Sequence, residues 1–124
     1  LKEVGYHAFN TYAFIRLFRN HPKHLFWKSD NFYKLISYMN SAEYQSEIFN
    51  SKYSFPYNPP GFEVYATNKY FDKINSVDSA FIKKIWKYQI NKSWDKNDEV
   101  MSRGTYDINT NIARAYECCE CVND

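Results

Sequence analysis

Glu63, Asp107 and His7 are the residues whose types and positions suit acid–base chemistry. Glu63 follows the stretch 58–61, Asn-Pro-Pro-Gly, where two prolines fix φ and disfavour helical geometry in the residues before them. Pro60 suits the first turn of a helix, because its missing N–H would be unsatisfied there anyway. The sequence therefore predicts a stiff loop that sets Glu63 near a helix N-terminus, where a carboxylate is electrostatically favoured.

Each of these residues has a functional and a structural interpretation. Glycoside hydrolysis usually needs two carboxylates, and Asp107, at the start of the last predicted helix, is the best partner for Glu63. Asp is also a leading N-cap residue, so Asp107 and Glu63 alternatively stabilise their own helices. His7 titrates near neutral pH and suits proton transfer, or it is a helix histidine bonded to a backbone carbonyl. Arg114 and Glu117 are most simply a structural ion pair.

The elements that must position these residues are helical, because apolar residues recur at helical spacing and no strand-like alternation of useful length occurs. Asn20-His21-Pro22 predicts the end of the first helix, and Ser29 or Asp30, Ser41 and Asp78 or Ser79 are predicted caps. Trp94 to Thr105 is predicted to be a long connection. The fold class is all-α, with four to five helices joined in antiparallel pairs. The predicted helices cover 2–20, 30–39, 61–71, 79–90 and 107–121, with a weaker one at 42–49.

Two of these helices have predicted buried faces. The first is apolar around most of its circumference, which predicts burial on most sides. The last has an apolar side that predicts packing against the core. These sets are Ala8, Phe9, Tyr12, Ala13, Phe14, Ile15, Leu17 and Phe18 in the first helix, and Ile108, Ile112, Ala115, Tyr116, Cys119 and Val122 in the last.

Composition limits the classes of protein that the chain can be. At 124 residues, with 44% hydrophobic and 24% charged residues, residues 1–124 are predicted to form one globular helical domain. The net charge of +2 comes from well-mixed charges without a basic stripe, so we expect no nucleic-acid partner. No apolar run approaches about 20 residues and no signal peptide is recognisable, so we expect no membrane partner. Because the chain begins at Leu1 rather than Met, we expect a fragment or a processed chain.

Aromatic residues are abundant, with 12 Tyr and 10 Phe. Tyr53, Phe55, Tyr57 and Phe62 lie around the proline loop. A tyrosine offers a flat apolar face and a polar hydroxyl, which suits stacking on a sugar and also suits a helical core. Both roles remain open for these side chains.

Cys118, Cys119 and Cys121 lie close together near the end of the chain. An odd, clustered set is not a disulfide framework, so we expect a reducing compartment and a cytoplasmic location. Structural zinc needs four ligands, and no second Cys or His cluster is present, so we predict no metal site and no cofactor. Small buried thiols are the favoured interpretation.

Three segments together carry a resemblance to a known family. They resemble the C-terminal part of sugar-acting α/α-toroid proteins, the six-hairpin glycosidase-like group that includes N-acylglucosamine epimerase relatives. In that group, loops entering the inner helices surround a carbohydrate pocket. A closed toroid has many more helices than this chain can form, so the resemblance implies part of a ring. The segments are 5–12 (GYHAFNTY), 57–63 (YNPPGFE) and 106–117 (YDINTNIARAYE).

The resemblance implies a carbohydrate-associated helical domain, part of a sugar epimerase or glycosidase-like protein. Its ligand would be a sugar or sugar acid, with His7 and Glu63 as acid–base groups and Asn10, Tyr57 and Asp107 in contact with the ligand. The alternative is a non-catalytic interaction module whose apolar surface binds another chain, a missing domain or a second copy. A truncated ring would expose apolar surface, so we expect self-association.

Overall fold

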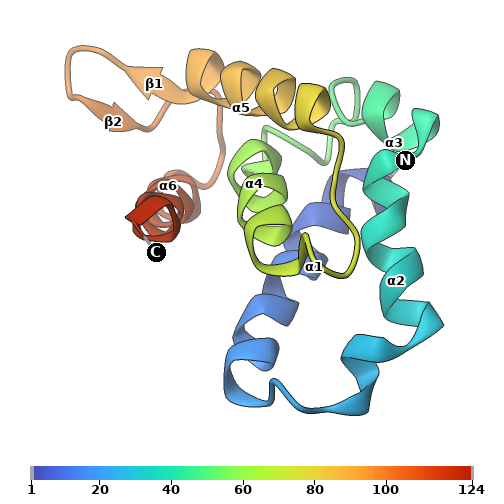
Figure 1. Cartoon of the computed structure of the whole chain (residues 1–124). Coiled ribbons are helices and arrows are strands. Elements are labelled where there is room, and N and C mark those ends of the chain that lie inside the picture. The colour runs from blue at the N-terminus through green and yellow to red at the C-terminus, as the bar shows by residue number, and fades with distance from the viewer. Residues whose placement is uncertain (1, 124) are drawn as a thin grey trace.

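The chain folds into helices joined by short turns and two longer connections, as seen in a computed structural model that describes the backbone of residues 2–123 and the side chains of residues 2–120 (Figure 1). The described part contains six α-helices and a single small hairpin, so the all-α prediction is confirmed at the level of a mostly helical fold. The elements are α1 (Lys2–Asn20), η1 (Leu25–Lys28), α2 (Asp30–Ser37), η2 (Tyr38–Asn40), α3 (Ala42–Glu47), α4 (Pro60–Phe71), α5 (Ser79–Ser93), β1 (Trp94–Asp95), β2 (Val100–Met101) and α6 (Ile108–Asn123).

Side-chain caps set the starts of several helices, as the sequence predicts. Ser29 Oγ accepts a hydrogen bond from the Phe32 amide at 3.2 Å, and Ser41 Oγ accepts one from Tyr44 at 3.1 Å. Asp78 caps α5 by accepting from the Phe81 amide at 3.1 Å. Such caps satisfy amides that have no partner within the helix, so they fix the starts of α2, α3 and α5.

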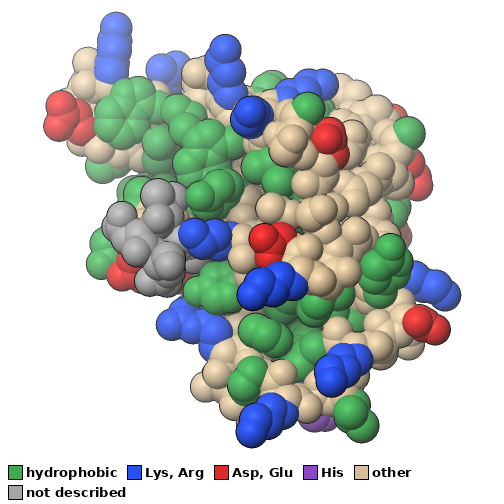
Figure 2. Space-filling view, in the orientation of Figure 1, with side chains coloured by type: hydrophobic (Ala, Val, Ile, Leu, Met, Phe, Trp, Pro, Cys, Tyr) green, Lys and Arg blue, Asp and Glu red, His purple; other side chains and the backbone are tan. Residues whose placement is uncertain are grey.

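Helix α4 is the centre of the arrangement, because it packs against α1, α5 and α6 (Figure 1). Aromatic side chains fill the space between α1, η1, α2 and α4, where Phe32 and Phe71 are fully buried and their ring centroids are 4.9 Å apart. Edge-to-face rings of this kind stabilise a core beyond the area they bury. Lys and Arg side chains project from the outer side of α5, away from α4 (Figure 2).

A glycine allows α4 to approach α5 closely. A Cβ atom on Gly61 would lie 2.4 Å from Gln89 Cβ, so no larger residue fits there without movement. The amide of Gly61 donates to Gln89 Oε1 at 3.1 Å, and Gln89 Nε2 donates to Ser93 Oγ at 2.8 Å and to Asn111 Oδ1 at 3.4 Å. Asn111 in turn donates to the Met101 carbonyl at 2.6 Å. A buried polar network therefore joins α4, α5, α6 and the hairpin.

Three sequence predictions about the fold are wrong. The connection 94–105 is not wholly irregular, because β1 and β2 pair in antiparallel register. Helix α1 is not buried on most sides, since Phe9, Ala13 and Leu17 are exposed. One face of α1 remains open to solvent because α4 covers only the side that carries Val4, Ala8 and the other buried residues of this helix.

The predicted buried face of α6 is the third correction. Ile108, Ile112 and Tyr116 are exposed, and so is Cys119, whereas Asn111 and Cys118 are buried. The inward face mixes polar and apolar residues: Asn111 joins the network described above, and Cys118 Sγ donates to the Phe62 carbonyl at 3.1 Å. Ala115 packs against the core, so the prediction is confirmed for that residue. The prediction of buried thiols is therefore confirmed for Cys118 and wrong for Cys119, while the side chains of Cys121 and Val122 lie outside the described residues.

Candidate functional site

Glu63 lies at the N-terminal turn of α4, and its side chain is fully buried. Arg114 Nε, from α6, donates to Glu63 Oε1 at 3.3 Å, whereas Oε2 has no hydrogen-bond partner among the described residues. Burial raises the pKa of the Glu63 carboxyl to about 7, against the opposing effect of the Arg114 guanidinium. A carboxyl with such a pKa is present in both protonation states near neutral pH, as a general acid or base requires.

Arg114 connects Glu63 to a second carboxylate. Its Nη1 lies 3.0 Å from Glu117 Oε2, and Glu117 also accepts a hydrogen bond from the Tyr12 hydroxyl of α1 and lies 3.5 Å from Arg16 Nη2. The Arg114 guanidinium carbon is 4.2 Å from the centroid of the Tyr12 ring, a cation–π contact. Burial alone would lower the pKa of Arg114, but Glu63 and Glu117 raise it overall, so Arg114 stays charged. We call Tyr12, Glu63, Arg114 and Glu117 the acidic cluster.

An aromatic row leads away from the acidic cluster. Its members lie with neighbouring ring centroids 5.2 to 6.3 Å apart, and Phe9, at one end, is 6.0 Å from the Arg114 guanidinium carbon. The members of this aromatic row, in spatial order, are Phe9, Tyr6, Tyr53, Tyr57 and Tyr106.

Backbone contacts hold the row in place. The loop before α4 lies directly against α1, since a Cβ on Gly5 would be 2.5 Å from the Tyr53 carbonyl carbon, and buried Asn58 donates to the Tyr53 carbonyl at 3.0 Å. The Tyr106 amide donates to the Pro56 carbonyl at 2.7 Å, which fixes the start of α6 beside the same loop. Phe55, by contrast, is buried and packs into the core.

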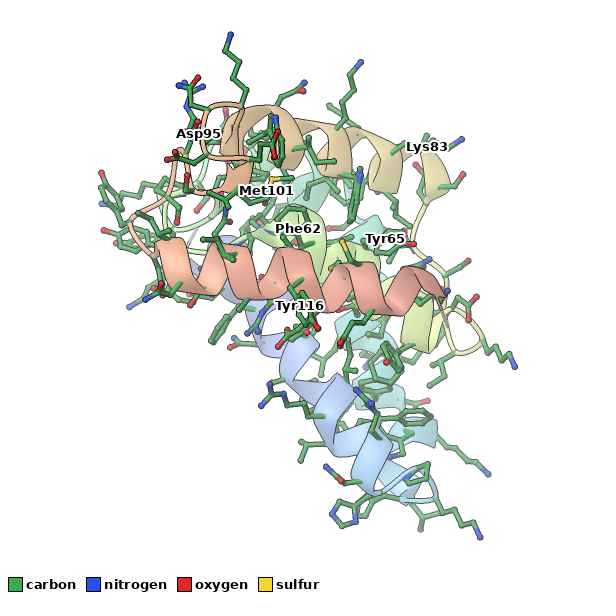
Figure 3. All side chains as sticks on the ribbon, turned by 90° about the vertical axis from the view of Figure 1, so that its left-hand side faces the viewer. Phe62, Tyr65, Lys83, Asp95, Met101 and Tyr116 are labelled. Carbon is green, nitrogen blue, oxygen red and sulfur yellow. The ribbon has the colours of Figure 1, made fainter. Side chains whose placement is uncertain are left out.

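The cluster and the row lie where α6 crosses α1. Seen from the left-hand side of Figure 1, α6 runs across the front with α1 descending behind it, and Tyr116 projects from the lower edge of α6 (Figure 3). Phe62, on the other side of α6 in this view, is buried between α4 and α5 (Figure 3). The site is therefore assembled from the middle of α1, the first turn of α4 and the middle of α6, which are far apart in the sequence.

His7 lies in a different environment from Glu63. Its Nε2 is 2.8 Å from the Leu35 carbonyl of α2, and its ring packs against Tyr38 and Tyr44 at centroid distances of 4.8 and 5.5 Å. Burial lowers the pKa of His7, so the ring is neutral at pH 7. This contact matches the structural interpretation of a histidine bonded to a backbone carbonyl. Tyr44, which is fully buried, connects the two environments, since the charge of Glu63 adds to burial in raising the pKa of its hydroxyl.

Of the three residues predicted to bind ligand, Tyr57 belongs to the aromatic row, while Asp107 and Asn10 are exposed. Asp107 is exposed and caps α6, with Oδ1 accepting from the Thr110 amide at 3.0 Å and Oδ2 from the Thr110 hydroxyl at 2.7 Å, which lowers its pKa. Asn10 is exposed on α1, and Tyr57 is 44% exposed within the aromatic row. The structure thus connects Tyr57 to Glu63 through one continuous set of contacts that passes along the row and through Arg114.

The cluster includes partners that sequence reasoning did not assign to a site. The sequence favours a structural pair for Arg114 and Glu117 and a core position for Tyr12. The i,i+3 spacing of Arg114 and Glu117 predicts that the two side chains lie on one face. Nothing in the sequence indicates that this face meets Glu63 and Tyr12.

The described residues also bear on two further features, a metal site and a membrane-spanning helix. Among them, no group of three or more His, Cys, Asp and Glu side chains is placed to hold a metal ion. Within the same residues, no helix is both long and apolar enough to cross a membrane.

One curated protein is similar to most of this chain. Over 117 residues, which are 94% of its length, this chain is 41% identical to archaeal glycosylation protein Q of Haloferax volcanii. The chain spans about 30% of the length of that relative. No protein-family model matches the chain, and no solved structure matches it.

Proposed function

We propose that this chain is a carbohydrate-associated domain of a glycosylation-related protein, in which the acidic cluster contacts a sugar and Glu63 exchanges a proton with it. Because the Glu63 side chain is fully buried, this exchange requires α4 and α6 to separate locally when the sugar binds. The observation that carries the proposal is the fully buried Glu63, held through Arg114 beside a second carboxylate and a row of aromatic rings. The similar Haloferax protein is named a glycosylation protein, which supports a carbohydrate-associated role.

The chemistry of the cluster suits sugar recognition. Carboxylates accept hydrogen bonds from sugar hydroxyls, a guanidinium donates them, and aromatic faces cover the apolar faces of sugar rings. With Oε1 bound to Arg114, the proton of neutral Glu63 is placed on Oε2. In this proposal Glu63 is the acid–base group and Glu117, rather than Asp107, is the second carboxylate. His7 supports the site indirectly, because its ring packs against Tyr44.

The arrangement also supports the resemblance to a segment of an α/α-toroid. The three segments that carry the resemblance contribute Phe9 and Tyr12, Glu63, and Arg114 and Glu117, and these side chains touch one another. Convergence of the three segments on one polar cluster agrees with the resemblance, although only Glu63 comes from the first turn of its helix. We propose a sugar epimerase-like or glycosidase-like ancestry for the domain on this basis.

A sugar-binding screen tests the proposal. The purified chain is titrated against neutral sugars, amino sugars and uronic acids, with binding followed by protein NMR chemical shifts and by thermal stability. We expect one class of sugar to stabilise the protein and to shift resonances of the acidic cluster, because a ligand that binds only the folded state stabilises it.

Two variants make the test specific. Glu63→Gln should abolish the sugar-induced shifts while the fold remains intact, whereas Glu120→Gln, an equal charge change at an exposed position of α6, should not. Sugar binding that is unchanged in Glu63→Gln would contradict the proposal.

A second function, a helical interaction module, is favoured by the apolar residues that α6 and α1 leave exposed. Ile112 and Tyr116 of α6 are 37% and 66% exposed, and Leu17 of α1 is 50% exposed. Exposed apolar residues on neighbouring helices are typical of a surface that another polypeptide covers. Under this alternative, light scattering would detect concentration-dependent association that Ile112→Glu abolishes, and no sugar would bind.

A further inference from the structure

The aromatic row extends well beyond the acidic cluster, which raises the question of what its far end binds. We propose that the row binds a chain of several sugars, so that the ligand is an oligosaccharide with one end at the acidic cluster and the rest along Tyr57 and Tyr106. This inference rests on the proposed function, since it names the size of the ligand for the same site.

The length of the row is the first argument. Neighbouring centroids are 6.3 Å apart from Tyr53 to Tyr57 and 5.2 Å apart from Tyr57 to Tyr106. A pyranose is similar in size to one aromatic ring, so a single sugar at the acidic cluster would leave Tyr57 and Tyr106 without a ligand. The planes of neighbouring rings are inclined by 29° from Tyr53 to Tyr57 and by 52° from Tyr57 to Tyr106, so successive sugar units would meet the outward faces and edges of successive rings. Rows of aromatic side chains contact repeated units in a similar way in single-strand nucleic-acid sites.

The exposure of the rings is the second argument. Tyr106 is 78% exposed and Tyr57 44% exposed, whereas core aromatic residues such as Phe55 are buried. Exposed tyrosines that a rigid backbone holds side by side supply contact area at a low cost in side-chain entropy. The backbone bond from the Tyr106 amide to the Pro56 carbonyl, at 2.7 Å, gives this rigidity.

The charges near the row agree with a polar, hydroxyl-bearing ligand. Lys52 Nζ and Lys2 Nζ lie 5.1 and 5.9 Å from the centroid of Tyr53, so the central ring of the row already has cationic neighbours. The ammonium groups and the tyrosine hydroxyls provide hydrogen-bond donors along the row. Tyr57 and Tyr106 are thus the rings best placed for stacking.

The test compares chain lengths on the intact protein. Glucose and N-acetylglucosamine are titrated alongside cellohexaose, maltohexaose and chitohexaose, with binding measured by calorimetry and by the NMR signals of tyrosine rings. We expect at least one hexasaccharide to bind more than tenfold more tightly than its own monosaccharide and to shift the ring signals of Tyr57 and Tyr106.

Variants assign that gain to the row. Tyr57→Ala and Tyr106→Ala should each weaken hexasaccharide binding by about three- to tenfold, from the usual strength of one aromatic contact, and Tyr106→Ala should leave monosaccharide binding unchanged. Tyr33→Ala, at an exposed tyrosine of α2, is the matched control and should have no effect.

The outcomes separate this inference from the proposed function. Equal affinity for monosaccharide and hexasaccharide, with loss in Glu63→Gln, would overturn the inference and leave the proposed function standing. A hexasaccharide gain that persists in both Tyr57→Ala and Tyr106→Ala would also overturn it. If no sugar of either length binds, both ideas fail.

Discussion

The buried carboxyl of Glu63 makes the stability of this protein depend on pH in an unusual direction. Burial raises its pKa from 4.5 to about 7, so the folded state binds a proton more tightly than the unfolded state. Between these two values the folded state carries more protons, and stability therefore falls as pH rises. A displacement of this size corresponds to about 3 kcal/mol of unfolding free energy, which is fully lost above pH 7.

Other groups near Glu63 must be separated from this effect. Burial lowers the pKa of His7, so its contribution to stability has the opposite sign and increases as pH rises. Arg114 stays protonated throughout, and burial raises the pKa of Tyr12 and Tyr44, so these three groups do not titrate in this window. The difference between wild type and Glu63→Gln removes the His7 contribution, since both proteins retain it.

Urea unfolding followed by circular dichroism, at about pH 5 and about pH 8, measures the effect. We expect Glu63→Gln to gain about 2–3 kcal/mol relative to wild type between these conditions, because glutamine stays neutral at both. Glu120→Gln, at an exposed position, should follow the wild type. Parallel pH profiles for wild type and Glu63→Gln would show that Glu63 is not a buried, proton-binding carboxyl, and the reasoning would be refuted.

Three further changes test the packing around the site by the free energy of unfolding. Gly61→Ala should destabilise the protein by about 1–3 kcal/mol, because the added Cβ would lie 2.4 Å from Gln89 Cβ; an unchanged stability would mean that α4 and α5 are further apart. Gln89→Leu should cost about 2–4 kcal/mol, since the Gly61 amide and Asn111 would lose a buried partner, and hydrogen exchange at Gly61 should accelerate. Asp107→Ala should cost about 1 kcal/mol through loss of the Thr110 cap, with Asp107→Asn retaining most of the stability, which a ligand-binding role alone would not predict.

Helix positions were predictable because they depend on local chemistry. Ser29, Ser41 and Asp78 are caps in the structure as in the sequence, and the loop before Glu63 leads into α4 at Pro60. These features involve residues within a few positions of each other. Local propensity and hydrogen bonding are sufficient to fix them.

The partners of Glu63 were not predictable, because they depend on which face of α6 turns inward. Hydrophobic periodicity favoured Ile108 and Ile112, yet the structure buries Asn111 and Cys118 instead. A single sequence does not show that Asn111 has a buried partner in Gln89, more than 20 residues earlier in the chain. In a sequence, polar residues with such distant partners look like surface residues. Hydrophobic periodicity therefore predicts the wrong inward face where buried polar contacts orient a helix.

That orientation has one cause and two consequences. Because the face of α6 that carries Asn111 and Arg114 turns inward, Arg114 reaches Glu63 while it pairs with Glu117 on its own helix, and the acidic cluster forms. For the same reason the apolar residues Ile112 and Tyr116 remain exposed, so the cost of exposing them is linked to the formation of the site. An exposed apolar face on α6 and a buried acidic cluster beneath it are therefore parts of one arrangement. A second polypeptide on the outer face of α6 would hold the inner face of that helix against Glu63.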